Sequence, residues 1–289
     1  MTSTEQKSQE VENALNTWLD RPDAERFHFT EPMASMQQQL GENMIQKSIM
    51  VDLKSVHNWY GNRFVKEGLE RQDTSLREPF FAWGYYTARI AGIFARAYPA
   101  NPPRLSFTDL AMIFSTCLQA KWYDKSKEIF HSIILGLDTK YLNKGLAFST
   151  SSWFILDLAN SCYATGINLS RFNYPKNMGI YQDVLDNWNT TDVKEVDRLV
   201  AALSDHHLDI AGFNEQTPND FSFEKEFVFA YEITAWLSLR KLMGLENPET
   251  FFHPLMQLVI NKAPGEEILF TANETCERVL QKLKEEFPE

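Results

Sequence analysis

Apolar residues recur along this chain at steps of three and four, and this spacing constrains the fold more than any other feature. A long example in residues 33–71 has apolar side chains at Met36, Leu40, Met44, Ile45, Ile49, Leu53 and Val56. Such a stripe covers one face of a helix and is usually buried. Strand-like alternation is hard to find, and the twelve glycines are scattered. The sequence therefore predicts an all-α protein, a bundle of about ten to twelve antiparallel helices.

Caps and breakers divide the chain into further helices. Ser106 with Asp109 three residues later is typical of a helix start, and Gly136 of an end, so residues 106–136 are expected to form a helical hairpin. Other helices are expected over residues 11–20, 33–71, 78–98, 153–164, 223–243, 250–260 and 271–285, with another starting at residues 191–192. Residues 138–152 are the best boundary between two helical halves, residues 1–140 and 150–289, which could also form one compact domain.

Three cysteines indicate the compartment. Cys117, Cys162 and Cys276 lie far apart in segments expected to be helical, and an odd number cannot complete a disulfide framework. Residues 1–12 are polar and acidic, unlike a signal peptide, and no apolar run approaches the roughly 20 residues that span a bilayer. We therefore expect a cytoplasmic protein.

Acidic residues are concentrated in residues 181–226. This stretch holds eleven acids against three bases and carries most of the chain's net charge of −11. The acids are Asp183, Asp186, Asp192, Glu195, Asp197, Asp205, Asp209, Glu215, Asp220, Glu224 and Glu226. An acidic surface repels nucleic acid and anionic membranes and attracts basic proteins at rates that depend on ionic strength. The charge predicts a basic protein partner, and neither nucleic acid nor membrane.

One cluster could support chemistry. Asp205, His206, His207 and Asp209 combine adjacent histidines with carboxylates, which could hold a divalent metal that activates water in a hydrolase. Neighbouring helical residues point about 100° apart, however, so the two histidines cannot easily share an ion. The alternative interpretation is a polar helix end. No other catalytic motif is present, so we expect neither an enzyme nor a cofactor.

Glu232 lies within the apolar run of residues 227–236, where a charge is costly unless it is paired or exposed. Two interpretations remain open. The carboxylate either anchors a nearby loop through buried hydrogen bonds, or faces a partner.

Residues 229–254 resemble the C-terminal part of the α-helical immunity proteins that protect bacteria from their own polymorphic toxins, particularly the group paired with nuclease toxins. The resemblance is carried by Tyr231, Glu232, Ala235, Gly244, Leu245, Glu246, Phe251, Phe252 and Pro254. Two features depart from that pattern, because Glu246 and Asn247 replace paired aspartates, and Phe252 and His253 replace tyrosines.

The resemblance implies an immunity protein that neutralises a cognate toxin delivered by a contact-dependent secretion system such as type VI. The toxin is expected to be a nuclease, whose basic active-site surface an acidic protein can cover. We expect the steering face to comprise Asp183, Asp186, Asp192, Glu195, Asp197, Asp205, Asp220 and Glu224, with Trp188 and Phe221 as anchors. The metal-dependent hydrolase and a helical adaptor or regulator without a toxin remain the alternatives.

Overall fold

The computed structural model describes residues 2–103, 105–142, 149–212 and 220–288. This part of the chain contains twelve α-helices and no strand, and one isolated bridge joins Leu105 and Leu142. The predicted all-α bundle is confirmed. Glu215 and residues 143–148, which fall within the predicted domain boundary, lie outside the described residues.

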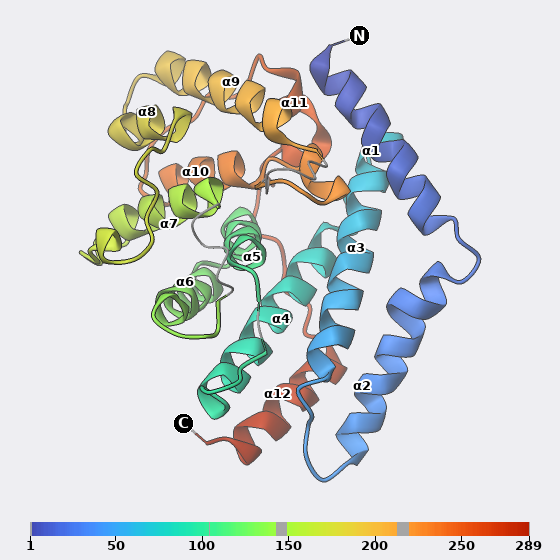
Figure 1. The fold of residues 1–289 in the computed structure, drawn as a ribbon. Helices are drawn as coiled ribbons and strands as arrows, with labels where there is room; N and C mark the ends of the chain where they lie inside the picture. The colour runs from blue at the N-terminus through green and yellow to red at the C-terminus, as the bar shows by residue number, and fades with distance from the viewer. Residues whose placement is uncertain (1, 104, 143–148, 213–219, 289) are drawn as a thin grey trace.

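The helices follow one another with short connections (Figure 1). Those of the first half are α1 (Ser3–Leu19), the π-helical turn η1 (Arg26–Thr30), α2 (Glu31–Gly41), α3 (Ile49–Arg71), α4 (Arg77–Ala97), α5 (Phe107–Gln119) and α6 (Tyr123–Leu137). Those of the second half are α7 (Thr150–Cys162), η3 (Leu169–Arg171), α8 (Ile180–Asn187), α9 (Val193–Ile210), η4 (Glu224–Phe227), α10 (Tyr231–Leu242), α11 (Pro254–Gln257), η5 (Val259–Asn261) and α12 (Glu274–Glu286).

Helix α5 lies at the centre of the molecule. It is buried along almost its whole length, and it packs against α4 and α6 on one side and α7 and α10 on the other (Figure 1). Its sequence explains this position, since residues 110–118 are almost entirely apolar and need cover on every side. Ser106 caps the helix by accepting a hydrogen bond from the backbone N–H of Asp109 (2.9 Å), as the sequence predicts.

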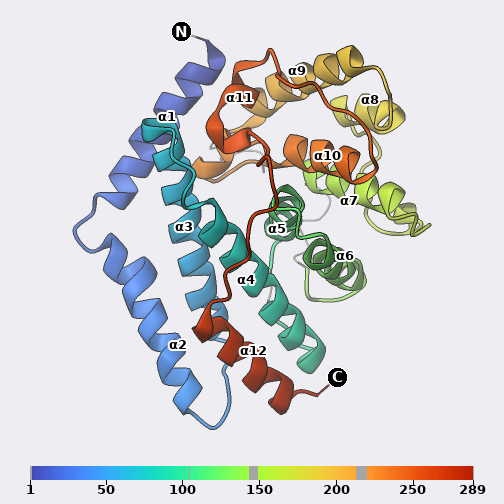
Figure 2. The ribbon, with the colours of Figure 1, turned by 180° about the vertical axis from the view of Figure 1, so that it is seen from behind.

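Elements from both predicted halves pack together. Helix α12 packs against α2 and α4, η4 packs against α1 and α3, and a single hydrophobic cluster contains buried side chains of both halves. An extended segment, residues 262–273, crosses the back of the molecule between η5 and α12 (Figure 2). It is fixed to the first half where Trp122 Nε1 donates to Ile268 O (2.6 Å) and Thr271 N donates to Glu78 Oε1 (2.9 Å).

The prediction of one helix over residues 33–71 was wrong. The chain forms α2 and α3 with a break at residues 42–48. The break is stabilised by a residue far away in sequence, because the Lys282 ammonium donates to the carbonyls of Gln39, Leu40 and Glu42. Ile45 N also donates to Glu286 Oε1 (2.9 Å). These contacts satisfy backbone groups that the apolar stripe alone would have kept in a helix.

The prediction of one helix over residues 223–243 was also wrong. This segment contains η4, a short non-helical connection, and then α10. Asn261 explains the connection, since its Oδ1 accepts from Ala230 N (3.0 Å) and its Nδ2 donates to Val228 O (2.8 Å). Residues 250–260 contain only the short α11 and η5, and the cap of α12 is Asn273 rather than Thr271.

The cysteines are buried thiols. Cys117, Cys162 and Cys276 form no disulfide and lie within the hydrophobic cluster. Among the described residues, every helix is too short or too polar to cross a bilayer.

Helix α3 and η5 pack closely at Gly68, and a substitution there can measure how little space this contact leaves. A Cβ at Gly68 would lie 2.3 Å from Ile260 Cγ2, whereas a Cβ at Gly41, in α2, would have no atom within 4 Å. We expect Gly68→Ala to lower the free energy of unfolding by about 1–3 kcal/mol through overpacking. The matched Gly41→Ala should be neutral or stabilising by up to about 1 kcal/mol. Urea denaturation measures both changes, and equal midpoints for the two variants would contradict this close contact.

Candidate functional site

Helices α8 and α9 pack against each other at one end of the molecule (Figure 1). Both carry exposed acidic residues. Their inner faces bury Tyr181 and Val184 of α8 and Val196, Leu199 and Leu203 of α9. The 3.6-residue period then directs the polar residues outward. We call the exposed or half-exposed acids of this pair the acidic face: Asp183, Asp186, Asp192, Glu195, Asp197, Asp205 and Asp209.

Few bases offset this charge. Only Lys194 and Arg198 accompany the seven acids within residues 180–210. Arg198 forms a two-pronged pair with Glu195, at 2.8 Å and 2.6 Å, which raises the pKa of the guanidinium; Asp183 on α8 contributes in the same direction. Asp192 caps α9 by accepting from Lys194 N (2.9 Å). The acidic face is therefore part of a folded, capped helix pair.

Arg240 fixes the position of the helix pair. This fully buried side chain of α10 donates from Nη1 to Trp188 O (2.7 Å) and from Nη2 to Thr190 O (2.9 Å), in the connection between α8 and α9. It also donates to Glu246 O (2.7 Å) and to Asn247 Oδ1 (2.9 Å). One guanidinium thus satisfies four acceptors from two loops. Sequence reasoning missed this role, because Arg240 stands in an ordinary basic helix end.

A second segment lies along α9. Phe252 N donates to Asp197 Oδ1 (3.4 Å), and His253 Nε2 lies 3.2 Å from Asp205 Oδ1. Residues of the acidic face and of the segment before α11 therefore contact each other, although about 50 residues separate them in sequence.

Two of the predicted face residues are not on the surface. Phe221 is fully buried, with its ring centroid 4.1 Å from that of His207, and Asp220 is 7% exposed and accepts from Ser151 N (2.6 Å). Phe221 cannot serve as an exposed anchor, nor Asp220 as an exposed steering charge, so both predictions are corrected. The physical reason is that residues 220–221 pack into the core instead of continuing the acidic surface.

Two further predicted residues occupy intermediate positions. Trp188 is half-buried against the core, and its carbonyl accepts from Trp236 Nε1 (3.1 Å) as well as from Arg240. Glu224 is half-exposed in η4, which packs against α1 and α3, whereas α8 packs against α7 and α9. Glu224 is therefore outside the acidic face as defined here.

The candidate metal cluster is dispersed around α9. His207 is buried, and its Nδ1 lies 2.8 Å from Glu232 Oε1, while His206 contacts the Tyr181 ring. Asp205 bonds His253 on another side of the helix. Within the described ranges, no group of three or more His, Cys, Asp or Glu side chains is placed to hold a metal ion. This geometry gives no support to the hydrolase interpretation.

Glu232 belongs to a buried polar cluster behind the acidic face. It is fully buried and bonded to His207 of α9, so it connects two helices and is not exposed to a partner. Burial raises the pKa of the nearby Asp220 carboxyl to about 6, and burial likewise raises that of Glu226 to about 7. Charging these carboxyls inside the protein is unfavourable, which makes the fold sensitive to pH.

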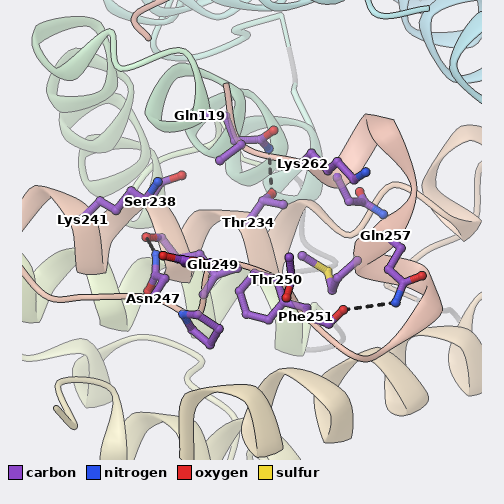
Figure 3. A pocket seen from close by; sticks show the side chains of 15 residues that line it. Gln119, Thr234, Ser238, Lys241, Asn247, Glu249, Thr250, Phe251, Gln257 and Lys262 are labelled. Carbon is purple, nitrogen blue, oxygen red and sulfur yellow. Dashed lines mark hydrogen bonds between the residues drawn. The ribbon is translucent and has the colours of Figure 1, made fainter. Parts of the chain in front are cut away.

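A cavity of about 730 Å³ lies between α10 and residues 247–263 (Figure 3). Leu237, Phe251 and Met256 supply apolar walls, and the two exposed lysines Lys241 and Lys262 also line it. Phe251, which lines the cavity, directly precedes Phe252 and His253, the two residues that contact α9. No sequence pattern predicted this cavity, because the residues that line it come from separate parts of the chain.

Comparison of the chain with protein-family models, curated proteins and solved structures found no match.

Removing the guanidinium of Arg240 should destabilise the connection between α8 and α9. We expect Arg240→Met to lower the free energy of unfolding by about 2–4 kcal/mol, because buried carbonyls lose their donor. Hydrogen exchange at residues 188–192 should accelerate. Lys241→Met, at the adjacent exposed position, is the control and should change neither quantity. An Arg240→Met protein as stable as the control would refute the anchoring role.

The raised pKa of Asp220 predicts a pH dependence. Its folded value of about 6 exceeds the ordinary 3.8, so its contribution to stability is complete below about pH 4 and is lost as the pH rises to about 6. The shift corresponds to about 3 kcal/mol. Asp220→Asn keeps an acceptor for Ser151 N and should remove this part of the decline, measured as unfolding free energy from pH 4 to 8. Asp209→Asn is the exposed control. If the two variants decline equally, the assignment fails.

Proposed function

We propose that this protein is an immunity protein that binds a cognate antibacterial toxin, a nuclease, and blocks its basic active-site surface. The observation that carries the proposal is the acidic face, seven acids on two helices with only two bases among them. The resemblance of residues 229–254 to immunity proteins supplies the biological class. Charge and resemblance are separate arguments that favour the same kind of partner.

Electrostatics explains how such a protein would act. A nuclease binds the phosphates of its substrate through lysine and arginine side chains. An acidic protein that occupies this surface excludes the substrate without performing chemistry. Complementary charge also accelerates association at low salt, so the toxin is captured before it reaches nucleic acid.

The dimensions of the face suit a protein partner. Helix α9 has 18 residues and is therefore about 27 Å long. A standard interface buries about 800 Å² on each partner and is therefore on the order of 30 Å across, which matches the length of α9. Because Arg240 holds the connection between the two helices and Asp192 caps α9, little ordering entropy should be lost on binding.

The proposal is tested by co-expressing this protein with the product of the reading frame adjacent to its gene. We expect that product to be lethal alone, harmless with this protein, and recovered in a complex with it. A harmless neighbour, or a lethal one that this protein neither binds nor suppresses, would contradict the proposal and leave an adaptor role as the better explanation.

Charge reversal on the acidic face tests whether electrostatic attraction accelerates binding of the toxin. Asp186→Lys with Asp209→Lys changes two exposed acids of the face, and within the described residues neither forms a hydrogen bond or an ion pair with another helix. We expect the association rate constant for the co-purified toxin to fall about tenfold at low salt, and the difference to shrink at high salt. The control is Glu274→Lys with Glu285→Lys, the same charge change on α12. Equal effects of the two pairs would show that only net charge matters.

A further inference from the structure

Phe252 is an apolar side chain that the fold does not use. Its side chain is 85% exposed, beside α9, whereas most of the phenylalanines that the structure describes are buried. Single exposed apolar residues are common on protein surfaces and need no explanation. In addition, side chains form hydrogen bonds with both the N–H and the carbonyl of the Phe252 backbone.

Polar contacts fix Phe252 from both sides. Its N–H donates to Asp197 Oδ1 (3.4 Å), and its carbonyl accepts from Gln257 Nε2 (3.2 Å), which also donates to Phe251 O (3.2 Å). The next residue is held as well. His253 Nδ1 accepts from Leu255 N (3.2 Å), so the ring proton lies on Nε2 and is donated to Asp205 Oδ1 (3.2 Å). The exposed ring therefore projects from a rigid turn.

Two acids lie beside the turn that carries the ring. Asp197 and Asp205 contact its own turn, and both belong to the acidic face. An aromatic side chain has few rotatable bonds and therefore loses little entropy on binding. Interface hot spots are typically aromatic residues surrounded by contacts that exclude water. This arrangement fits an apolar pocket surrounded by lysine or arginine.

We propose that Phe252 is the anchor of the acidic face, inserting into an apolar pocket on the basic surface of the protein that the face binds. The inference rests on the function proposed above and adds to it the residue that slows dissociation. A second copy of this chain is a poorer occupant, because a symmetric contact would bring two acidic faces together. The anchor thus replaces Phe221, which the core has buried.

The test compares Phe252→Ala with Leu269→Ala, an 83% exposed apolar residue on the segment that leads to α12. Both variants should keep the wild-type melting temperature, because neither side chain is packed. With the co-purified toxin as probe, Phe252→Ala should weaken binding about 30-fold, almost entirely through faster dissociation, with an unchanged dependence on salt. Phe252→Tyr should retain most of the affinity, and Leu269→Ala all of it.

The outcomes separate the two proposals. If wild type binds and protects but Phe252→Ala dissociates as slowly as Leu269→Ala, the anchor is refuted and the immunity function stands. If wild type neither binds nor protects, both proposals fail. If wild type instead forms a dimer in sedimentation experiments that Phe252→Ala dissociates, the ring contacts a second copy and the anchor proposal is overturned.

Discussion

The burial of α5 is the constraint on which the rest of this structure depends. A helix that is apolar on every side must be covered on every side, and α4, α6, α7 and α10 supply that cover. The cover is also specific, because Ser115 Oγ donates to Tyr231 O and Gln119 Nε2 donates to Thr234 Oγ1 (2.7 Å), both from α5 to α10. Helix α10 is thereby fixed in angle and register.

The position of α10 determines where the acidic residues lie. With one side against α5, it directs Arg240 toward the connection between α8 and α9, and Glu232 toward His207. A buried donor or acceptor that loses its partner is costly, so these contacts favour one arrangement of the helices. The position of the acidic face therefore depends on contacts that begin in the core, from α5 to α10 and from α10 to the α8–α9 pair. We expect these contacts to hold the charges in place before a partner binds.

The sequence predicted what local patterns encode. Apolar spacing and caps located α4 through α7, because helical period acts within a few residues. Six of the eight acids expected on the steering face are exposed or half-exposed on the α8–α9 pair, although the sequence did not predict α8 as a helix: Asp183, Asp186, Asp192, Glu195, Asp197 and Asp205. The sequence-based predictions were wrong where residues far away in the sequence determine the end of a helix. Lys282 and Asn261 supply the bonds that interrupt the expected helices, and no local signal reports them. The sequence also did not predict which aromatic side chains are exposed. Phe221 and Phe252 are equally apolar, yet Phe221 is fully buried and Phe252 is 85% exposed.

We propose that the preformed acidic face, with Phe252 beside it, is the surface that contacts the partner. Hydrogen–deuterium exchange of this protein, free and in complex with the product of the adjacent reading frame, locates that surface most directly. The account predicts that exchange slows in residues 181–210 and 250–257 and stays unchanged in α2 and α12. Slower exchange confined to α2, α6 or α12, with the acidic face unaffected, would contradict it.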